Sequence, residues 1–142
     1  MAELELAPYT LKPCMDATVD PRVLKWLEAH GVKKLLVAGC ALTSCVRVSS
    51  QVIKRARPSL DVFVDLELAA AREINYEKTA ADDPMLVEIY GDECEGASAA
   101  DLAVLQMREA GVRVLERGAW DEMVGDSVAA SGAPPPPPPA GE

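Results

Sequence analysis

Residues 35–46 read LLVAGCALTSCV, and this stretch decides the fold of the chain. An apolar run ends at a glycine, a short polar loop follows, and Cys45 opens a second amphipathic segment. The pattern predicts a strand, a tight turn and a helix start, which is where α/β proteins place reactive groups. A thiol at a helix start faces unpaired backbone N–H groups and the positive end of the helix dipole. Because both lower a cysteine pKa, we predict that Cys45 is a nucleophile.

Helical and extended patterns alternate on both sides of this stretch. Helices are expected over 20–31, 45–56 and 98–111, and strands over 32–39, 60–68 and 112–115. A helical turn is expected over 69–72, a short helix within 85–90, and a last turn or loop over 120–124. The unbroken apolar run 35–38 predicts a first strand that is covered on both faces. The alternation predicts an α/β fold, a three-layer α/β/α Rossmann-like arrangement with a parallel sheet of about three strands.

The length and composition of the chain indicate how far the domain extends and which kinds of partner are excluded. The chain has 142 residues, and we expect one domain over 1–127 and a disordered Pro-rich tail over 128–142, where six prolines follow one another. The formal charge of −9 argues against binding to nucleic acid. No apolar run approaches the roughly 20 residues that span a bilayer, and no signal peptide is visible, so a cytoplasmic location is expected.

The four cysteines and the single histidine predict no metal site. The cysteines are irregularly spaced, so a disulfide scaffold is not expected, and Cys40 is interpreted as a small buried apolar residue. A redox pair of Cys40 and Cys45 is disfavoured because the spacing is C-x-x-x-x-C and not C-x-x-C. His30 lies in the last turn of a helix, where it complements the dipole. The acidic stretch 73–96 lacks the spacing of a calcium loop and is interpreted as solvated surface.

The nucleophile segment resembles that of the isochorismatase-like cysteine hydrolases, a family that includes nicotinamidases and N-carbamoylsarcosine amidases. Gly39 lies six residues before Cys45, and Val46 follows it, as in the family pattern G-x-x-T-x-x-C-V. The resemblance extends over about residues 12–115, but it covers only the C-terminal half of a family member. The resemblance implies hydrolysis of an amide or ureido C–N bond through a thioester, with no cofactor.

The resemblance also implies roles for the residues around the thiol. Lys12 is the candidate for the catalytic lysine, and an exposed lysine near a chain end is the alternative interpretation. The backbone N–H groups of Ala41 and Cys45 would hold the oxyanion. A cis peptide between Cys40 and Ala41 would shape the loop.

Two departures from the family pattern matter for activity. Leu42 stands where the family usually has threonine. The general base of the family is an aspartate in the N-terminal half, which we expect to be absent; Asp16 and Asp65 are possible substitutes, but neither lies in the family position. The alternative function is therefore a non-catalytic remnant that acts as a binding or assembly module. Because the edge beside the first strand would be bare, we expect a homo-oligomer or a partner that completes the sheet.

Overall fold

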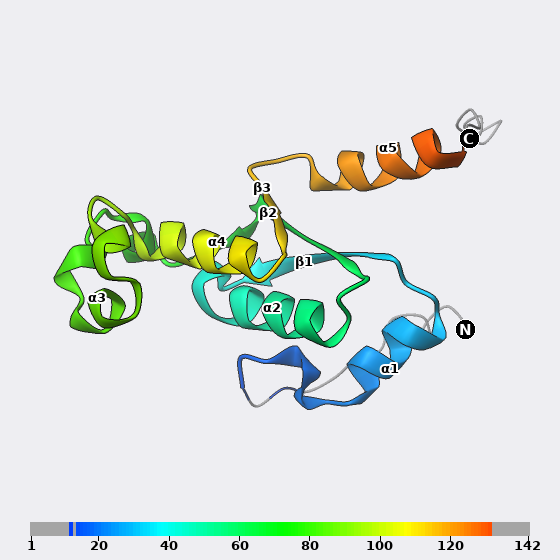
Figure 1. Cartoon of the computed structure of the whole chain (residues 1–142), viewed down its shortest axis with the longest axis horizontal. Coiled ribbons are helices and arrows are strands. Elements are labelled where there is room, and N and C mark those ends of the chain that lie inside the picture. The colour runs from blue at the N-terminus through cyan, green and yellow to red at the C-terminus, as the bar shows by residue number, and fades with distance from the viewer. Residues whose placement is uncertain (1–11, 13, 132–142) are drawn as a thin grey trace.

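The computed structural model of the chain describes residue 12 and residues 14–131, and for 126–131 only the helical backbone. Three parallel strands alternate with helices in the described part, as Figure 1 shows. The strands are β1 (Lys34–Cys40), β2 (Asp61–Ala70) and β3 (Arg113–Leu115). The helices are α1 (Arg22–Ala29), α2 (Arg47–Ala56), α3 (Pro84–Tyr90), α4 (Ala99–Glu109) and α5 (Ala119–Ser131).

The sheet has the order β1-β2-β3, so the described strands leave β1 at one edge. Val37 pairs with Val64, but two residues later Gly39 pairs with Ala69, so β2 bulges between these pairs. On its other side β2 pairs with β3, with Asp65 opposite Leu115. This confirms the predicted α/β fold with a three-stranded parallel sheet.

Helices cover both faces of the sheet and give it three layers. On one face, the buried core joins Val62 and Val64 to Ile53 of α2 and Met107 of α4. On the other face, Phe63 packs against Ala119 and Met123 of α5, with Leu36 and Leu115 beside them. Figure 1 shows α5 on the side of the sheet opposite α2. The period-2 alternation of a strand sends neighbouring side chains to opposite faces and so produces both cores.

The prediction that the first strand is covered on both faces is wrong for its second half. Residues 35–37 are only half-buried, and Ala38, Gly39 and Cys40 are exposed. The strand covered on both faces is β2 in its first half, where Val62, Phe63 and Val64 have no exposed surface. The physical reason is that the helices pack against Leu35, Leu36 and Val37, whereas residues 38–40 belong to neither core.

Three element boundaries differ from the sequence prediction. The helical turn expected over 69–72 is wrong at its start, because β2 continues through Ala70, which pairs with Cys40. Helical backbone begins at Leu42 and not at Cys45, in a π-helical turn over Leu42–Val46 that leads into α2. The last turn expected over 120–124 is a full helix that extends to Ser131, past the expected start of the tail at 128. Residues 132–142 lie outside the described part.

The predicted start of α4 is confirmed in detail. The Ser98 hydroxyl accepts from the Asp101 N–H, and the Asp101 carboxylate accepts from the Ser98 N–H, which together form a capping box. The capping box fixes where the helix begins and thereby sets α4 against α2. None of the helices in the described part of the chain combines the length and apolar character that crossing a bilayer requires.

Candidate active site

The loop after β1 folds back on itself around the carbonyl of Ala41. The peptide bond between Cys40 and Ala41 is cis. The Ala41 carbonyl accepts from the N–H of Ser44 at 3.0 Å and from the N–H of Val46 at 3.1 Å. These two bonds close the π-helical turn and present Cys45 at the carboxyl end of β1.

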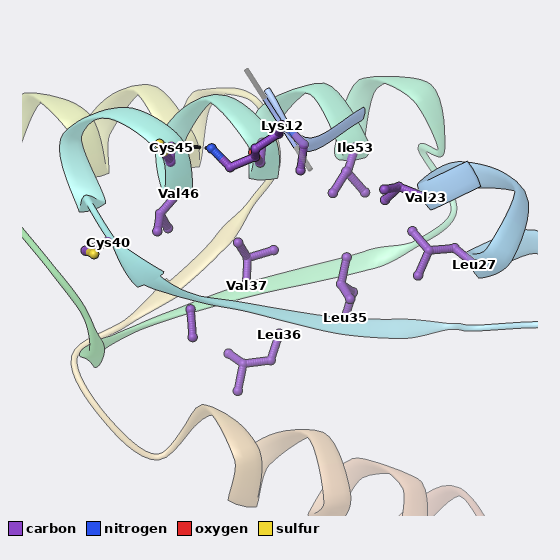
Figure 2. A pocket seen from close by; sticks show the side chains of 13 residues that line it. Lys12, Val23, Leu27, Leu35, Leu36, Val37, Cys40, Cys45, Val46 and Ile53 are labelled. Atoms are coloured by element: carbon purple, nitrogen blue, oxygen red, sulfur yellow. Dashed lines mark hydrogen bonds between the residues drawn. The ribbon is translucent and has the colours of Figure 1, made fainter. Parts of the chain in front are cut away.

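Lys12 contacts the thiol of Cys45. Its Nζ lies 3.2 Å from Cys45 Sγ and also donates to the carbonyl of Cys14 at 2.9 Å. Figure 2 shows the lysine side chain extended toward the cysteine. The structure therefore brings together two of the residues singled out in the sequence, from segments that are 33 residues apart.

The surroundings of Cys45 lower the pKa of its thiol below the ordinary value. The hydrogen bond from Lys12 is the largest cause, and the positive charge of Lys12 adds to it. The Ala41 N–H and the Ser44 side chain also hydrogen-bond the sulfur and lower the pKa, whereas desolvation raises it. Since donors stabilise the charged form, the arrangement favours the thiolate, which is the nucleophilic form.

Ser49 holds the segment that carries Lys12 against α2. Its hydroxyl accepts from the Ala17 N–H at 3.0 Å and donates to the Met15 carbonyl at 3.0 Å. Ser49 is buried and lies one helical turn beyond Cys45. Sequence analysis missed both Ser49 and Ser44. The spacing of four residues from Cys45 was the available signal for Ser49, because it places both side chains on one face.

A pocket of about 340 Å³ lies beside the thiol. Its walls come from β1, α1 and α2, and Figure 2 shows Lys12 and Cys45 beside a mostly aliphatic lining. Cys40 also lines this pocket and is exposed, so its interpretation as a buried apolar residue is wrong. The reason is that the described residues place nothing over the carboxyl end of β1.

Neither nominated acid reaches the thiol. The Asp16 carboxylate accepts from the N–H and the hydroxyl of Thr18. Asp65 is buried, and its two oxygens accept from the N–H of Glu67 at 2.9 Å and of Ala119 at 3.0 Å. Asp65 thus caps the first residue of α5. Within the described ranges, no carboxylate is hydrogen-bonded or ion-paired to Cys45.

Leu42, which stands where the family pattern has threonine, is almost completely buried in the main core. An apolar side chain at this position anchors the first residue of the π-helical turn by packing. Among residues 12 and 14–125, no group of three or more His, Cys, Asp or Glu side chains is placed to hold a metal ion.

Comparison of the sequence with protein-family models and with curated proteins finds no match. Solved structures, however, match the arrangement of its elements. An isochorismatase family protein from Desulfovibrio vulgaris aligns with a TM-score of 0.53 at 20% identity, over 84% of this chain and 53% of that one. The chain has the isochorismatase-like α/β fold.

Two YcaC structures share this isochorismatase-like fold. YcaC from Pseudomonas aeruginosa, solved with hexane-2,5-diol and covalent acrylamide, aligns with a TM-score of 0.52 at 21% identity, over 80% of this chain and 45% of that one. YcaC from Escherichia coli is described as an octameric hydrolase of unknown specificity. It aligns with a TM-score of 0.51 at 21% identity, over 92% of this chain and 56% of that one. This chain therefore spans about half the length of each solved structure that it matches.

Proposed function

We propose that this chain is a cysteine hydrolase that cleaves an amide or ureido C–N bond, with Cys45 as its nucleophile. The contact of 3.2 Å between Lys12 Nζ and Cys45 Sγ is the observation that carries the proposal. It is supported by the lowered pKa of the thiol and by the pocket beside it. The isochorismatase-like fold of hydrolase neighbours adds a second, independent line of support.

The proposed reaction begins with attack of the Cys45 thiolate on the carbonyl carbon of the substrate. The N–H groups of Ala41 and Cys45 are the proposed donors to the oxyanion that forms. The Ala41 N–H also contributes to the lowered pKa of the thiol, which supports its proposed place near the reacting sulfur. Collapse of the tetrahedral intermediate expels the nitrogen and leaves a thioester, which water then hydrolyses.

In this scheme, Lys12 has two proposed roles. Its ammonium group stabilises the thiolate before the attack, so a base need not remove the thiol proton during that step. We propose that the same ammonium group donates a proton to the leaving nitrogen. The carbonyl of Cys14 accepts a hydrogen bond from Nζ and fixes the direction of the side chain.

The pocket favours a small substrate with an apolar part. About 340 Å³ is at the lower end of the range for small-molecule sites, and most of the lining side chains are aliphatic. We propose a small amide of the kind that nicotinamidases or N-carbamoylsarcosine amidases act on. In such a substrate, the carbonyl group would contact the thiolate and the small apolar part would fill the aliphatic pocket.

Covalent acrylamide in YcaC from Pseudomonas aeruginosa offers a direct probe. Acrylamide is an electrophile to which a thiolate adds, and its carboxamide resembles the group that we propose as substrate. We expect acrylamide to label Cys45 faster than Cys14 near neutral pH, because the contact with Lys12 favours the thiolate at Cys45.

The proposal is tested by hydrolysis of a panel of amides, including nicotinamide and ureido acids, by the wild-type chain and by Cys45→Ala. Ammonia release should be lost in Cys45→Ala and retained in Lys25→Met, whose side chain lies exposed on α1. If the wild-type chain alkylates readily at Cys45 but hydrolyses none of the amides, the hydrolase proposal fails. The non-catalytic alternative, a binding or assembly module, then takes its place.

We further propose that residues 1–127 belong to one domain, that the Pro-rich tail begins after α5 ends at Ser131, and that a homo-oligomer or a partner completes the sheet. The uncovered edge of β1 in the described residues supports association, as does the octamer described for YcaC from Escherichia coli. Sedimentation should give a mass above the 15.1 kDa of one chain. All four cysteines are free, which fits the cytoplasm as the proposed location.

A further inference from the structure

The backbone carbonyl of Cys14 and the sulfur of Cys45 contact the same lysine amine. Lys12 Nζ lies 2.9 Å from the Cys14 carbonyl oxygen and 3.2 Å from Cys45 Sγ, so that oxygen and that sulfur lie within about 6 Å of each other. Cys14 is exposed, and Cys45 is partly exposed at the pocket. The backbone of one accessible cysteine and the sulfur of another therefore contact the same lysine amine.

The backbone around Cys14 is held close to the helix that follows Cys45. Ser49 binds the Met15 carbonyl, one residue after Cys14, and Ser49 lies one turn beyond Cys45 in the chain. Cys14 itself lies in a bend outside any helix or strand, and its thiol is directed to the Asp16 carbonyl at 3.7 Å. Because Cys14 lies outside the regular elements, its side chain can turn away from the Asp16 carbonyl without breaking a helix or strand hydrogen bond.

Cys40 is the competing partner, and its position makes it a poorer one. It lies at the end of β1, paired with Ala70, and is joined to the loop whose Ala41 carbonyl accepts from Ser44 and Val46. Moving the Cys40 sulfur to Cys45 would break these bonds within a short closed turn. Cys94 is buried in a separate core cluster with Ala80 and Leu102 and is inaccessible.

We propose that Cys45 is a site of reversible oxidation by hydrogen peroxide and that Cys14 is its resolving cysteine, with a Cys14–Cys45 disulfide as the product. The proposal uses the same thiolate as the proposed hydrolase, but it requires no hydrolysis. A thiolate that is accessible and stands next to a second cysteine is the arrangement in which oxidation stops at a disulfide and does not continue to higher acids.

The chemistry has two balanced steps. The Cys45 thiolate attacks one oxygen of hydrogen peroxide; an S–O bond forms, the O–O bond breaks, and hydroxide leaves, so that Cys45 becomes a sulfenic acid. The Cys14 thiolate then attacks the Cys45 sulfur; an S–S bond forms, the S–O bond breaks, and a second hydroxide leaves. The two thiols are oxidised by two electrons in total, and the peroxide is reduced to two molecules of water.

The disulfide would switch off the site. It consumes the sulfur that Lys12 contacts and fixes residue 14 against the pocket mouth. Alkylation of Cys45 is therefore expected to disappear in the oxidised chain and to return after treatment with dithiothreitol, since a thiol reductant reopens the bond by exchange.

The test is mass-spectrometric peptide mapping of the full chain after a short treatment with hydrogen peroxide, without reduction. The wild type should yield a linked peptide containing Cys14 and Cys45 as its main oxidised product. Cys40→Ser should give the same linked peptide. Cys14→Ser should yield no linked peptide and should instead carry sulfinic acid on Cys45, because the resolving thiol is gone.

Other products would overturn the proposal. A Cys40–Cys45 link would assign the resolving role to the wrong residue, and sulfinic acid on Cys45 in the wild type would show that no cysteine resolves it. A covalent Lys12–Cys45 product would replace the disulfide with a different modification. None of these readouts depends on amide hydrolysis, so failure here is distinguishable from failure of the proposed function.

Discussion

Lys12 Nζ lies 3.2 Å from Cys45 Sγ although 33 residues separate the two in the chain. The contact exists because β1 and the π-helical turn present the thiol at one edge of the sheet while Ser49 holds the segment after Lys12 on α2. The reactivity of Cys45 is thus a property of the tertiary fold. A helix start alone, as expected from the local sequence pattern, supplies only part of it.

Replacing Lys12 with Met should raise the pKa of Cys45, because the largest cause of its lowering is removed. The thiolate persists to lower pH in the wild type, so the pH midpoint of alkylation should move upward in Lys12→Met. At pH 7 the rate of reaction with iodoacetamide should fall about three- to tenfold, since each pKa unit changes the thiolate fraction about tenfold. Mass spectrometry of the Cys45 peptide across pH measures the shift.

The control for this prediction is Lys25→Met, which removes an exposed lysine of α1 and should leave the midpoint unchanged. Lys12→Arg keeps the positive charge, so the pKa of Cys45 should stay partly lowered in this variant. An alkylation profile of Lys12→Met that overlays the wild type would mean that Lys12 does not act on the thiol in solution.

Ser49→Ala should loosen the attachment of the segment that carries Lys12. The Ala17 N–H loses its acceptor and the Met15 carbonyl loses its donor, so the free energy of unfolding should fall by about 1–2 kcal/mol. The alkylation midpoint of Cys45 should also rise, as in Lys12→Met, because the lysine is no longer held in place. Urea unfolding and alkylation measure the two effects.

Ser50→Ala is the matched control for Ser49→Ala. Its hydroxyl is also buried in α2 but donates to the Arg47 carbonyl within the same helix. This variant should leave the alkylation midpoint where it is. If both serine variants shift the midpoint equally, the effect belongs to the helix as a whole and not to the bridge made by Ser49.

Much of the fold could be predicted because its signals are local. The capping box at Ser98 and Asp101 and the glycine at the end of β1 each fix an element boundary within a few residues. The order of the elements also predicts a bare edge beside β1, and the described strands have it there. An unbroken apolar run does not show how far helices cover a strand, so the exposure of residues 38–40 could not be predicted.

The candidate site was predictable only in part. Cys45 stands out by its place after an apolar strand, but Lys12 was found by resemblance, since a spacing of 33 residues carries no periodicity. Ser49 was missed because a serine within a helix is usually a surface residue, and only the fold shows that its partners come from residues 15 and 17. Asp65 was nominated as an acid, but the fold uses it to cap α5.

Asp65→Asn should destabilise the chain without changing the thiol. Both carboxylate oxygens accept backbone N–H groups, from Glu67 and Ala119, and the asparagine NH₂ group would face one of these donors. The free energy of unfolding should fall by about 1–3 kcal/mol. Asp121→Asn, at an exposed position in α5, should have little effect. If the alkylation midpoint of Cys45 moved in Asp65→Asn, Asp65 would be coupled to the site after all.

Asp101 should contribute stability that disappears in acid. Lys78 and the Ser98 N–H hold the pKa of its carboxyl below the usual range, so the ionised form stabilises the fold. This contribution is present above the unfolded pKa, about 3.8, and is lost as the pH falls through the lower pKa of the folded state. Asp101→Ala should therefore lower the free energy of unfolding at pH 7, by about 0.5–1 kcal/mol for the lost cap. Urea unfolding should show this difference shrinking toward about pH 3. The control is Glu88→Ala, which changes an exposed side chain on α3. If the difference in unfolding free energy between the wild type and Asp101→Ala stays constant with pH, the Asp101 carboxylate acts through packing and not through its charge.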